Sequence, residues 1–213
     1  MRMAIWLSAA MALSLTAAVA GAEPQAGRDY VAVVPPQPTS DAKRIVVTEF
    51  FSYACPHCAA FYPPLSKWAA ALPKDVLFER VAVVVGHTPW TKPAQLFYTL
   101  NALGKADSLD AAIFSAIHRE NVGLSTDDQV IDWVAKHGVD RTEFTNAFNS
   151  FSIKSFVGRG DQLAKTYRLS GVPTLVVDGK YMVSINDDGV FTDQLGIVDQ
   201  LIAKARAERA KPQ

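Results

Sequence analysis

The chain has 213 residues, 49% of them hydrophobic, and its 21 basic and 21 acidic residues give a formal net charge of zero. So balanced a charge does not favour binding to nucleic acid or to an anionic lipid surface. A chain of this length can bury a core large enough to fold without disulfide staples. Cys55 and Cys58 are its only cysteines, which excludes a scaffold of several disulfides.

The first 22 residues have the pattern of a secretory signal peptide. Arg2 gives a basic start, residues 4–19 form an apolar run, and the Ala-Gly-Ala of residues 20–22 fits a cleavage site. The apolar run is short for a spanning helix, although an uncleaved anchor is the alternative. Cleavage would leave a mature chain from Glu23, in a compartment where disulfides persist.

The segment Ile45–Cys58 is the central feature of the sequence, because it carries both cysteines. Its first part, Ile45–Phe51, is mostly β-branched and aromatic, which predicts a strand covered on both faces. Pro56 suits the first position of a helix, so Cys55 is expected at a helix N-terminus. Unpaired backbone N–H groups and the helix dipole favour negative charge there and lower the pKa of a thiol.

The two thiols are expected to differ in role. Cys55 is predicted to be the nucleophile, and His57 can add a donor or a positive charge to its thiolate. Cys58, one helical turn later, is predicted to close the disulfide. A stabilised thiolate is a better leaving group and makes the disulfide more oxidising, so the pair should donate its disulfide to substrates.

Three other interpretations of the cysteine pair are possible. A zinc site needs four ligands, but no second Cys-x-x-Cys exists and His87, His118 and His137 lack metal-ligand spacing. A structural disulfide would close a very small loop and restrict the unfolded chain little. Inert buried thiols would leave Pro56 and His57 without a purpose. The pattern therefore favours a redox centre.

The segment Glu49–Cys58, which ends in Cys-Pro-His-Cys, resembles the active site of the DsbA family. These are periplasmic thiol:disulfide oxidoreductases of the thioredoxin superfamily, whereas Gly-Pro between the cysteines is typical of thioredoxin. The resemblance continues more loosely over nearly all of the mature chain. It implies an α/β thioredoxin fold with an inserted all-helical domain and no bound cofactor or metal.

In chain order, a first strand is expected within Tyr30–Val34, before the strand that leads to the cysteines. Pro63 and Pro64 are expected to interrupt and kink the cysteine helix, which should end near Pro73. Val76–Val85 is predicted to be the next strand, parallel to the strand Ile45–Phe51.

Residues 89–167 show apolar residues at helical intervals and no convincing strand. The predicted helices are Lys92–Leu103, Leu109–Glu120, Asp127–Lys136, Thr142–Phe148 and Ile153–Tyr167. Gly104 and Gly138 are expected to end the first and third, and Asp140 with Glu143 to form a capping box for the fourth. This segment resembles the helical insertion of the DsbA family.

The strand pattern then resumes. Leu175–Val177 and Lys180–Ser184 are predicted to form a hairpin around Asp178-Gly179. The loop Asn186–Gly189 lacks the ligands of a calcium loop, and Thr192–Arg209 is predicted to be an amphipathic helix. The expected organisation is a signal peptide (1–22), a thioredoxin-like domain in two parts (23–88 and 168–213), and a helical insertion domain (89–167).

Two further site predictions rest mainly on the resemblance. Val172 and Pro173 match the position of the family's cis-proline, opposite the cysteine pair, although an ordinary trans proline is the alternative. A cis proline would expose the backbone of Val172 to an extended substrate strand and would hinder metal capture by the thiols. Glu49 is either an edge residue facing water or a partly buried carboxylate that tunes Cys58 or relays protons for it, with Arg80 as a possible partner.

The resemblance implies a periplasmic, monomeric oxidase of cysteine pairs in unfolded exported proteins, reoxidised by a DsbB-like membrane partner. A disulfide reductase or isomerase is the alternative, although Glu23–Arg44 is too short for the dimerisation domain that isomerases carry. A thiol-based metal- or peptide-binding chaperone is a further alternative from another class. The shortage of other ligands and the position of Pro173 argue against it.

Overall fold

The computed structural model describes residues 23–185 and 191–211, so the expected signal peptide and the Asn186–Gly189 loop lie outside the described residues. The strands of one sheet are β1 (Val31–Ala32), β2 (Ile45–Phe51), β3 (Val76–Ala82), β4 (Thr174–Val177) and β5 (Tyr181–Ser184). Their order is β1-β5-β4-β2-β3, with β2 and β3 parallel and the other pairs antiparallel. The strand that leads to the cysteines therefore lies inside the sheet.

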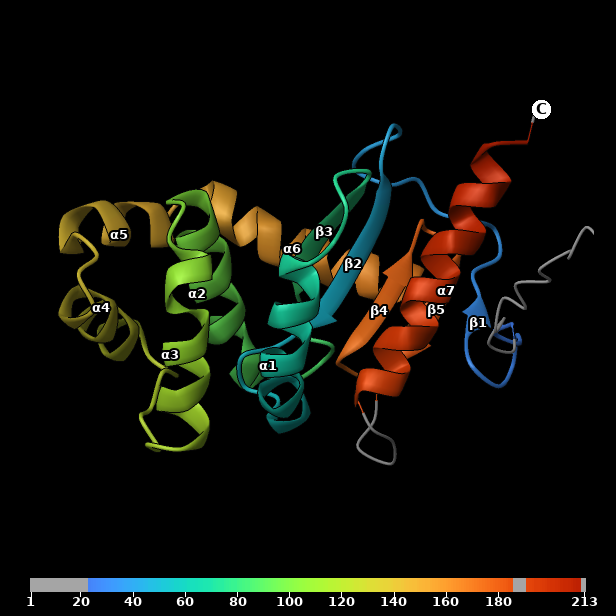
Figure 1. Ribbon diagram of the computed structural model, residues 1–213. Helices are drawn as coiled ribbons and strands as arrows, with labels where there is room; N and C mark the ends of the chain where they lie inside the picture. The colour runs from blue at the N-terminus through green and yellow to red at the C-terminus, as the bar shows by residue number, and fades with distance from the viewer. Residues whose placement is uncertain (1–22, 186–190, 212–213) are drawn as a thin grey trace, which may run out of the picture.

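Helices cover both faces of this sheet. Helices α1 (Pro56–Ala70) and α7 (Phe191–Arg209) lie on one face and α6 (Phe151–Thr166) passes behind the other (Figure 1). Side chains of β2 alternate between the two, because successive residues of a strand point to opposite faces. Val47 packs in the cluster that includes α1 and α7, whereas Phe50 packs with residues of α6. The prediction of a strand buried on both faces is confirmed.

An all-helical segment separates β3 from β4. It consists of a 3₁₀ turn η1 (Thr88–Trp90), α2 (Thr91–Ala102), α3 (Ala106–His118), α4 (Asp127–Lys136), α5 (Arg141–Phe148) and α6. Each predicted helix is present within three residues of its expected ends, and Gly104 and Gly138 follow two of them with positive φ. The fold is a thioredoxin fold with a helical insertion, as the resemblance implied.

One hydrophobic cluster joins the insertion to the cysteine turn. It contains Phe51, Tyr53 and Cys58 together with Phe97 of α2 and Phe114 of α3. The ring centroids of Phe51 and Phe97 lie 4.9 Å apart, and those of Tyr53 and Phe114 lie 5.1 Å apart. Edge-on aromatic pairs of this kind contribute beyond the area they bury. The insertion therefore packs directly on the segment that precedes the cysteines.

The expected interruption of the cysteine helix is wrong. Helix α1 runs continuously from Pro56 to Ala70, through Pro63 and Pro64, and ends before Pro73. The prolines deprive the carbonyls of Ala59 and Ala60 of their helical donors. Ala59 is half-buried and Ala60 is exposed, so this part of the helix lies at the surface of the molecule.

Two smaller features also differ from expectation. Strand β1 is only two residues long, because the chain continues into Pro35 and Pro36, which have no N–H to donate to a sheet. At α5, the Asp140 side chain accepts the Glu143 N–H at 2.7 Å, as predicted. A capping box with both reciprocal bonds forms one helix earlier, at Thr126.

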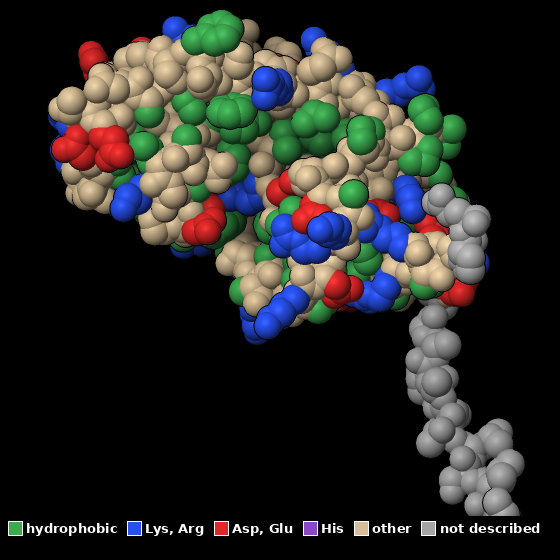
Figure 2. Space-filling model, turned by 90° about the horizontal axis from the view of Figure 1, so that it is seen from above, with side chains coloured by type: hydrophobic (Ala, Val, Ile, Leu, Met, Phe, Trp, Pro, Cys, Tyr) green, Lys and Arg blue, Asp and Glu red, His purple; other side chains and the backbone are tan. Residues whose placement is uncertain are grey.

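The surface of the described part is mixed in charge. Seen from above, basic and acidic side chains are interspersed on one face, with apolar side chains between them (Figure 2). Among the described residues, no helix has the length and apolarity required to cross a membrane.

Candidate active site

The first cysteine lies where the sequence predicted it. Cys55 is the N-cap of α1, with φ −86° and ψ 120°, and Pro56 occupies the first turn. The Cys55 N–H donates to the Ser52 carbonyl at 3.1 Å and closes a turn between β2 and the helix. The thiol is therefore held beside the unpaired N–H groups of the first helical turn.

This position favours the Cys55 thiolate. The pKa of Cys55 is lowered to about 6, chiefly by a hydrogen bond from the Cys58 thiol and against the opposing effect of burial. The backbone N–H groups of Cys58 and His57 contribute to this net shift, and the charge interaction with His57 adds a smaller part. Above about pH 6 Cys55 is therefore mainly a thiolate, the reactive form in disulfide exchange.

Cys58 has the opposite character. It has no exposed surface. Burial raises the pKa of Cys58 well above its ordinary value, and the hydrogen bond and charge of Cys55 and the charge of Glu49 add to the effect. The two sulfur atoms are not joined by a disulfide in this structure. The pair thus consists of one stabilised thiolate and one thiol that strongly retains its proton.

The loop of Val172 and Pro173 faces the cysteines. The peptide bond between these residues is cis, as the resemblance implied. The Sγ atom of Cys55 lies 3.4 Å from the Val172 carbonyl oxygen, close enough for the thiol to donate to it. Only the protonated thiol can make this bond; the thiolate accepts from backbone N–H groups instead. Residues 117 positions apart in the chain thereby meet at the reactive sulfur.

Glu49 is not an edge residue. It lies on the internal strand β2 with 1% of its surface exposed, so the interpretation of a water-facing carboxylate is wrong. Arg80 is its neighbour in the β2–β3 register, and Arg80 Nε lies 2.6 Å from Glu49 Oε2. The proposed partner is therefore confirmed. Glu49 is two residues from Val47 in β2, so both side chains point to the same face of the strand, the one that is covered by α1.

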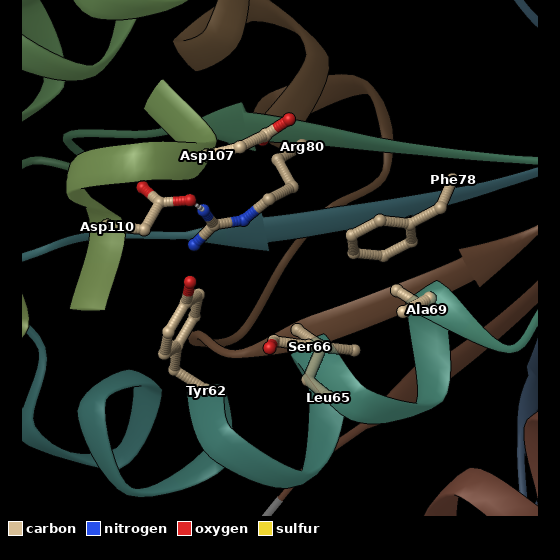
Figure 3. Close-up of a pocket in the computed structure, with 9 residues that line it drawn as sticks. Tyr62, Leu65, Ser66, Ala69, Phe78, Arg80, Asp107 and Asp110 are labelled. Carbon is tan, nitrogen blue, oxygen red and sulfur yellow. Dashed lines mark hydrogen bonds and ion pairs between the residues drawn. The ribbon is translucent and has the colours of Figure 1, made fainter. Parts of the chain in front are cut away.

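The sequence analysis missed Asp110, on α3. Arg80 Nη1 lies 2.7 Å from Asp110 Oδ2, and the two side chains point at each other in Figure 3. The Tyr53 hydroxyl donates to the other carboxylate oxygen of Asp110. The available signal was an acid on the apolar face of a helix, since Asp110 stands between the buried Leu109 and Ile113.

Glu49, Arg80 and Asp110 form a buried charge cluster with two acids and one base. Burial raises the pKa of both carboxyl groups, against the opposing charge and hydrogen bonds of Arg80. Burial acts to lower the pKa of Arg80, but the two acids outweigh it and the net shift is upward. The guanidinium also packs 3.7 Å from the centroid of the Phe51 ring. When all three groups are charged, the cluster carries one net negative charge near Cys58.

A cavity of about 380 Å³ lies beside this cluster, between α1, α3 and β3 (Figure 3). Its lining residues include Tyr62, Phe78, Arg80, Asp107 and Asp110. Arg80 and Asp110 of the buried charge cluster therefore border a cavity. Among the described residues, no three His, Cys, Asp or Glu side chains are arranged to hold a metal ion.

Comparison with known proteins identifies the family. Residues 85–194 match the model of the DSBA-like thioredoxin domain. Over 186 residues, 87% of this chain and 88% of the relative, the sequence is 40% identical to the thiol:disulfide interchange protein DsbA of Pseudomonas aeruginosa. The chain belongs to the DsbA family. DsbA of Bordetella pertussis is similar over a longer span, with 39% identity over 94% of this chain and 96% of that protein.

Solved DsbA structures have the same fold. The crystal structure of Pseudomonas aeruginosa DsbA has a TM-score of 0.83 and 39% identity, and covers 88% of this chain and 97% of its own. The DsbA oxidoreductase from Xylella fastidiosa has a TM-score of 0.79 and 35% identity, over 86% and 98%. This chain is accordingly a thiol:disulfide oxidoreductase of the DsbA family.

Proposed function

We propose that this DsbA-family protein donates the Cys55–Cys58 disulfide to cysteine pairs of unfolded exported proteins. The observation that carries the proposal is the asymmetry of the thiols: the pKa of Cys55 is lowered to about 6, while that of Cys58 is raised well above its ordinary value. Stabilisation of the Cys55 thiolate favours the reduced pair, so the oxidised pair is a strong electron acceptor.

The reaction proceeds by two exchanges. A substrate thiolate attacks Sγ of Cys55, the Cys55–Cys58 bond breaks, and Cys58 leaves as a thiolate that takes up a proton. A second substrate thiolate then attacks the substrate sulfur of this mixed disulfide, and Cys55 leaves. Two electrons pass from the substrate dithiol to the cysteine pair. The low pKa of Cys55 makes it a good leaving group in the second exchange.

Glu49 is proposed to serve the proton transfer at Cys58. A leaving thiolate there needs a proton, because the folded protein strongly favours the thiol form of Cys58. Glu49 is buried and its charge acts on Cys58, and burial raises the pKa of its own carboxyl above the ordinary value. A carboxyl group with a raised pKa keeps its proton to higher pH and can pass that proton to a nearby base.

The remaining site residues are proposed to bind substrate and to position and stabilise the Cys55 thiolate. The Val172 backbone, beside Cys55 and followed by Pro173, would pair with an extended substrate segment. Pro56 starts the helix that presents Cys55, and His57 is exposed on its first turn. The protein would act as a monomer in the periplasm after removal of residues 1–22 and would be reoxidised by a DsbB-like membrane partner.

We also propose that residues 23–88 and 168–213 form the thioredoxin-like domain, with residues 89–167 inserted as the helical domain. The insertion follows β3 and precedes β4, so both parts of the sheet flank it. The cysteine turn, Glu49 and Pro173 all come from the thioredoxin-like parts.

The decisive experiment is the reduction potential of the cysteine pair. Purified mature protein is equilibrated in glutathione buffers of graded composition, and the fraction of reduced Cys55 and Cys58 is scored by alkylation and mass measurement. A potential well above that of the glutathione couple supports a disulfide donor. A potential near or below that of thioredoxin would overturn the proposal in favour of a reductase.

A further inference from the structure

The peptide unit between Tyr53 and Ala54 is hydrogen-bonded at both ends. Its N–H group, on Ala54, donates to the Ser52 hydroxyl at 3.2 Å. Its carbonyl oxygen, on Tyr53, lies 2.7 Å from Nε2 of His118. A carbonyl can only accept, so His118 must carry a proton on Nε2. This peptide lies at the centre of the Ser52–Cys55 turn.

The orientation of a central turn peptide is the main freedom that such a turn has. Type I and type II turns differ by a flip of this unit, while the hydrogen bond that closes the turn is kept. His118 and Ser52 together fix the orientation. Cys55 follows directly, and its thiolate depends on the N–H groups of His57 and Cys58 being aimed at Sγ.

The hydrogen bond to the Tyr53 carbonyl comes from the helical insertion. His118 is the last residue of α3, and its ring stacks on Phe114, which in turn contacts the ring of Tyr53. Asp110, two turns earlier on α3, accepts the Tyr53 hydroxyl. A rise of about 12 Å separates the two positions along a helix. Helix α3 therefore forms hydrogen bonds to both the side-chain hydroxyl and the main-chain carbonyl of Tyr53.

We infer that His118 is a positioning residue for the Cys55 thiolate, through its hydrogen bond to the Tyr53 carbonyl. Helix α3 thereby takes part in setting the reactivity of a cysteine that the thioredoxin-like part carries. The inference rests on the proposed thiol chemistry of Cys55, and it adds a residue outside the Cys-Pro-His-Cys motif. A loose turn would let Sγ leave the N–H groups and would raise the pKa of the thiol.

The test is the pH profile of Cys55 alkylation by iodoacetamide in the reduced full-length mature protein. His118→Leu removes the donor. His137→Leu is the matched control, because His137 also bonds a backbone carbonyl, that of Trp133 at 2.8 Å, but on α4. Loss of a hydrogen bond of typical net strength corresponds to about a fivefold change in an equilibrium constant.

We expect His118→Leu to move the alkylation midpoint to higher pH and to slow alkylation at about pH 6 up to about fivefold. His118→Gln, which keeps an N–H donor, should recover part of the loss, and His137→Leu should match the unsubstituted protein. Ser52→Ala removes the hydroxyl that accepts from the Ala54 N–H, and it gives an independent variant if His118→Leu does not fold. It should shift the alkylation profile in the same direction.

An unchanged profile in folded His118→Leu, or an equal shift in His137→Leu, would overturn the inference. If His118→Leu does not fold, an unchanged profile in Ser52→Ala would overturn it. These outcomes do not depend on whether the proposed oxidase function is correct. An unsubstituted protein that alkylates at low pH but has a low reduction potential would refute the oxidase role and leave the inference intact.

Discussion

Glu49 and Arg80 stand side by side on the parallel strands β2 and β3, with Arg80 Nε 2.6 Å from the carboxylate and only 1% and 10% of the two side chains exposed. Arg80 also pairs with Asp110, so one guanidinium balances two buried acids. Breaking a buried ion pair leaves an uncompensated charge, which costs far more than loss of an exposed pair.

We therefore expect Arg80→Met to lower the free energy of unfolding by about 3–5 kcal/mol. Urea unfolding measures the change. Arg141→Ala is the control, because Arg141 pairs with Asp132 while both side chains are 56% exposed. That substitution should cost about 1 kcal/mol or less. Equal losses in the two variants would contradict the special role of the buried cluster.

Glu49→Gln should lower the pKa of Cys58, because the negative charge of Glu49 is one of the causes that raise it. The measurement is an ultraviolet titration of the Cys58 thiolate in a Cys55→Ser background. Glu79→Gln is the control: Glu79 is on β3, next to Arg80 in sequence, and accepts from the Ser40 and Thr48 hydroxyls. If Glu49→Gln titrates like Glu79→Gln, Glu49 has no electrostatic influence on the pair.

Cys58→Ser should trap a covalent adduct. When the reduced variant meets a protein with mispaired disulfides, the Cys55 thiolate attacks one of them and releases a substrate thiol. The enzyme has no second thiol of its own to resolve the mixed disulfide, so the adduct should accumulate and appear on a non-reducing gel. Cys55→Ser should form none, since Cys58 has no exposed surface. Adducts of similar yield from both variants would refute the assignment of Cys55 as nucleophile.

The stability of the reduced protein should rise with pH across the titration of Cys55. Its pKa is about 6 in the folded protein against an ordinary value of 9.0, so the folded state releases this proton first. The stabilisation is fully present above pH 9 and is lost as the pH falls through about 6. Melting temperatures of the reduced protein and of Cys55→Ser, compared from pH 6 to pH 9, should diverge as the pH rises. Parallel curves would contradict the depressed pKa.

Gly160→Ala should destabilise the protein by about 1–3 kcal/mol through overpacking. A Cβ atom there would lie 2.5 Å from both the Ala82 carbonyl oxygen and the Tyr98 hydroxyl oxygen. These two groups are hydrogen-bonded to each other at 2.9 Å and have little room to move. Gly158 lies on the same helix with open space around it, so Gly158→Ala should stabilise the protein by about 0.5–1 kcal/mol. Thermal unfolding distinguishes the two.

What the sequence could predict was local. The run Ile45–Phe51 indicated a buried strand by its residue types, and Pro56 indicated where the next helix begins; both features lie within a few positions of Cys55. The pairing of Glu49 with Arg80 depends on the register of β2 and β3, which no pattern within either strand specifies.

Asp110 and His118 could not be found in this way. The Tyr53–Asp110 bond joins residues 57 positions apart, and the His118–Tyr53 bond joins residues 65 positions apart. Contacts of this kind depend on how α3 docks on the sheet, which no local pattern encodes. Pro63 shows the opposite limit of sequence-based prediction: it is a strong local signal for a break, yet α1 continues through it.

The shared aromatic packing of Phe51 and Tyr53 with Phe97 and Phe114 bears on how this architecture can be altered. An insertion with a separate core could be exchanged between relatives as a detachable module, or deleted. Here removal of the helices would strip the cover from the strand end that carries the cysteines. A chimera that receives its insertion from another relative should retain oxidoreductase activity only if the donor supplies side chains complementary to Phe51 and Tyr53.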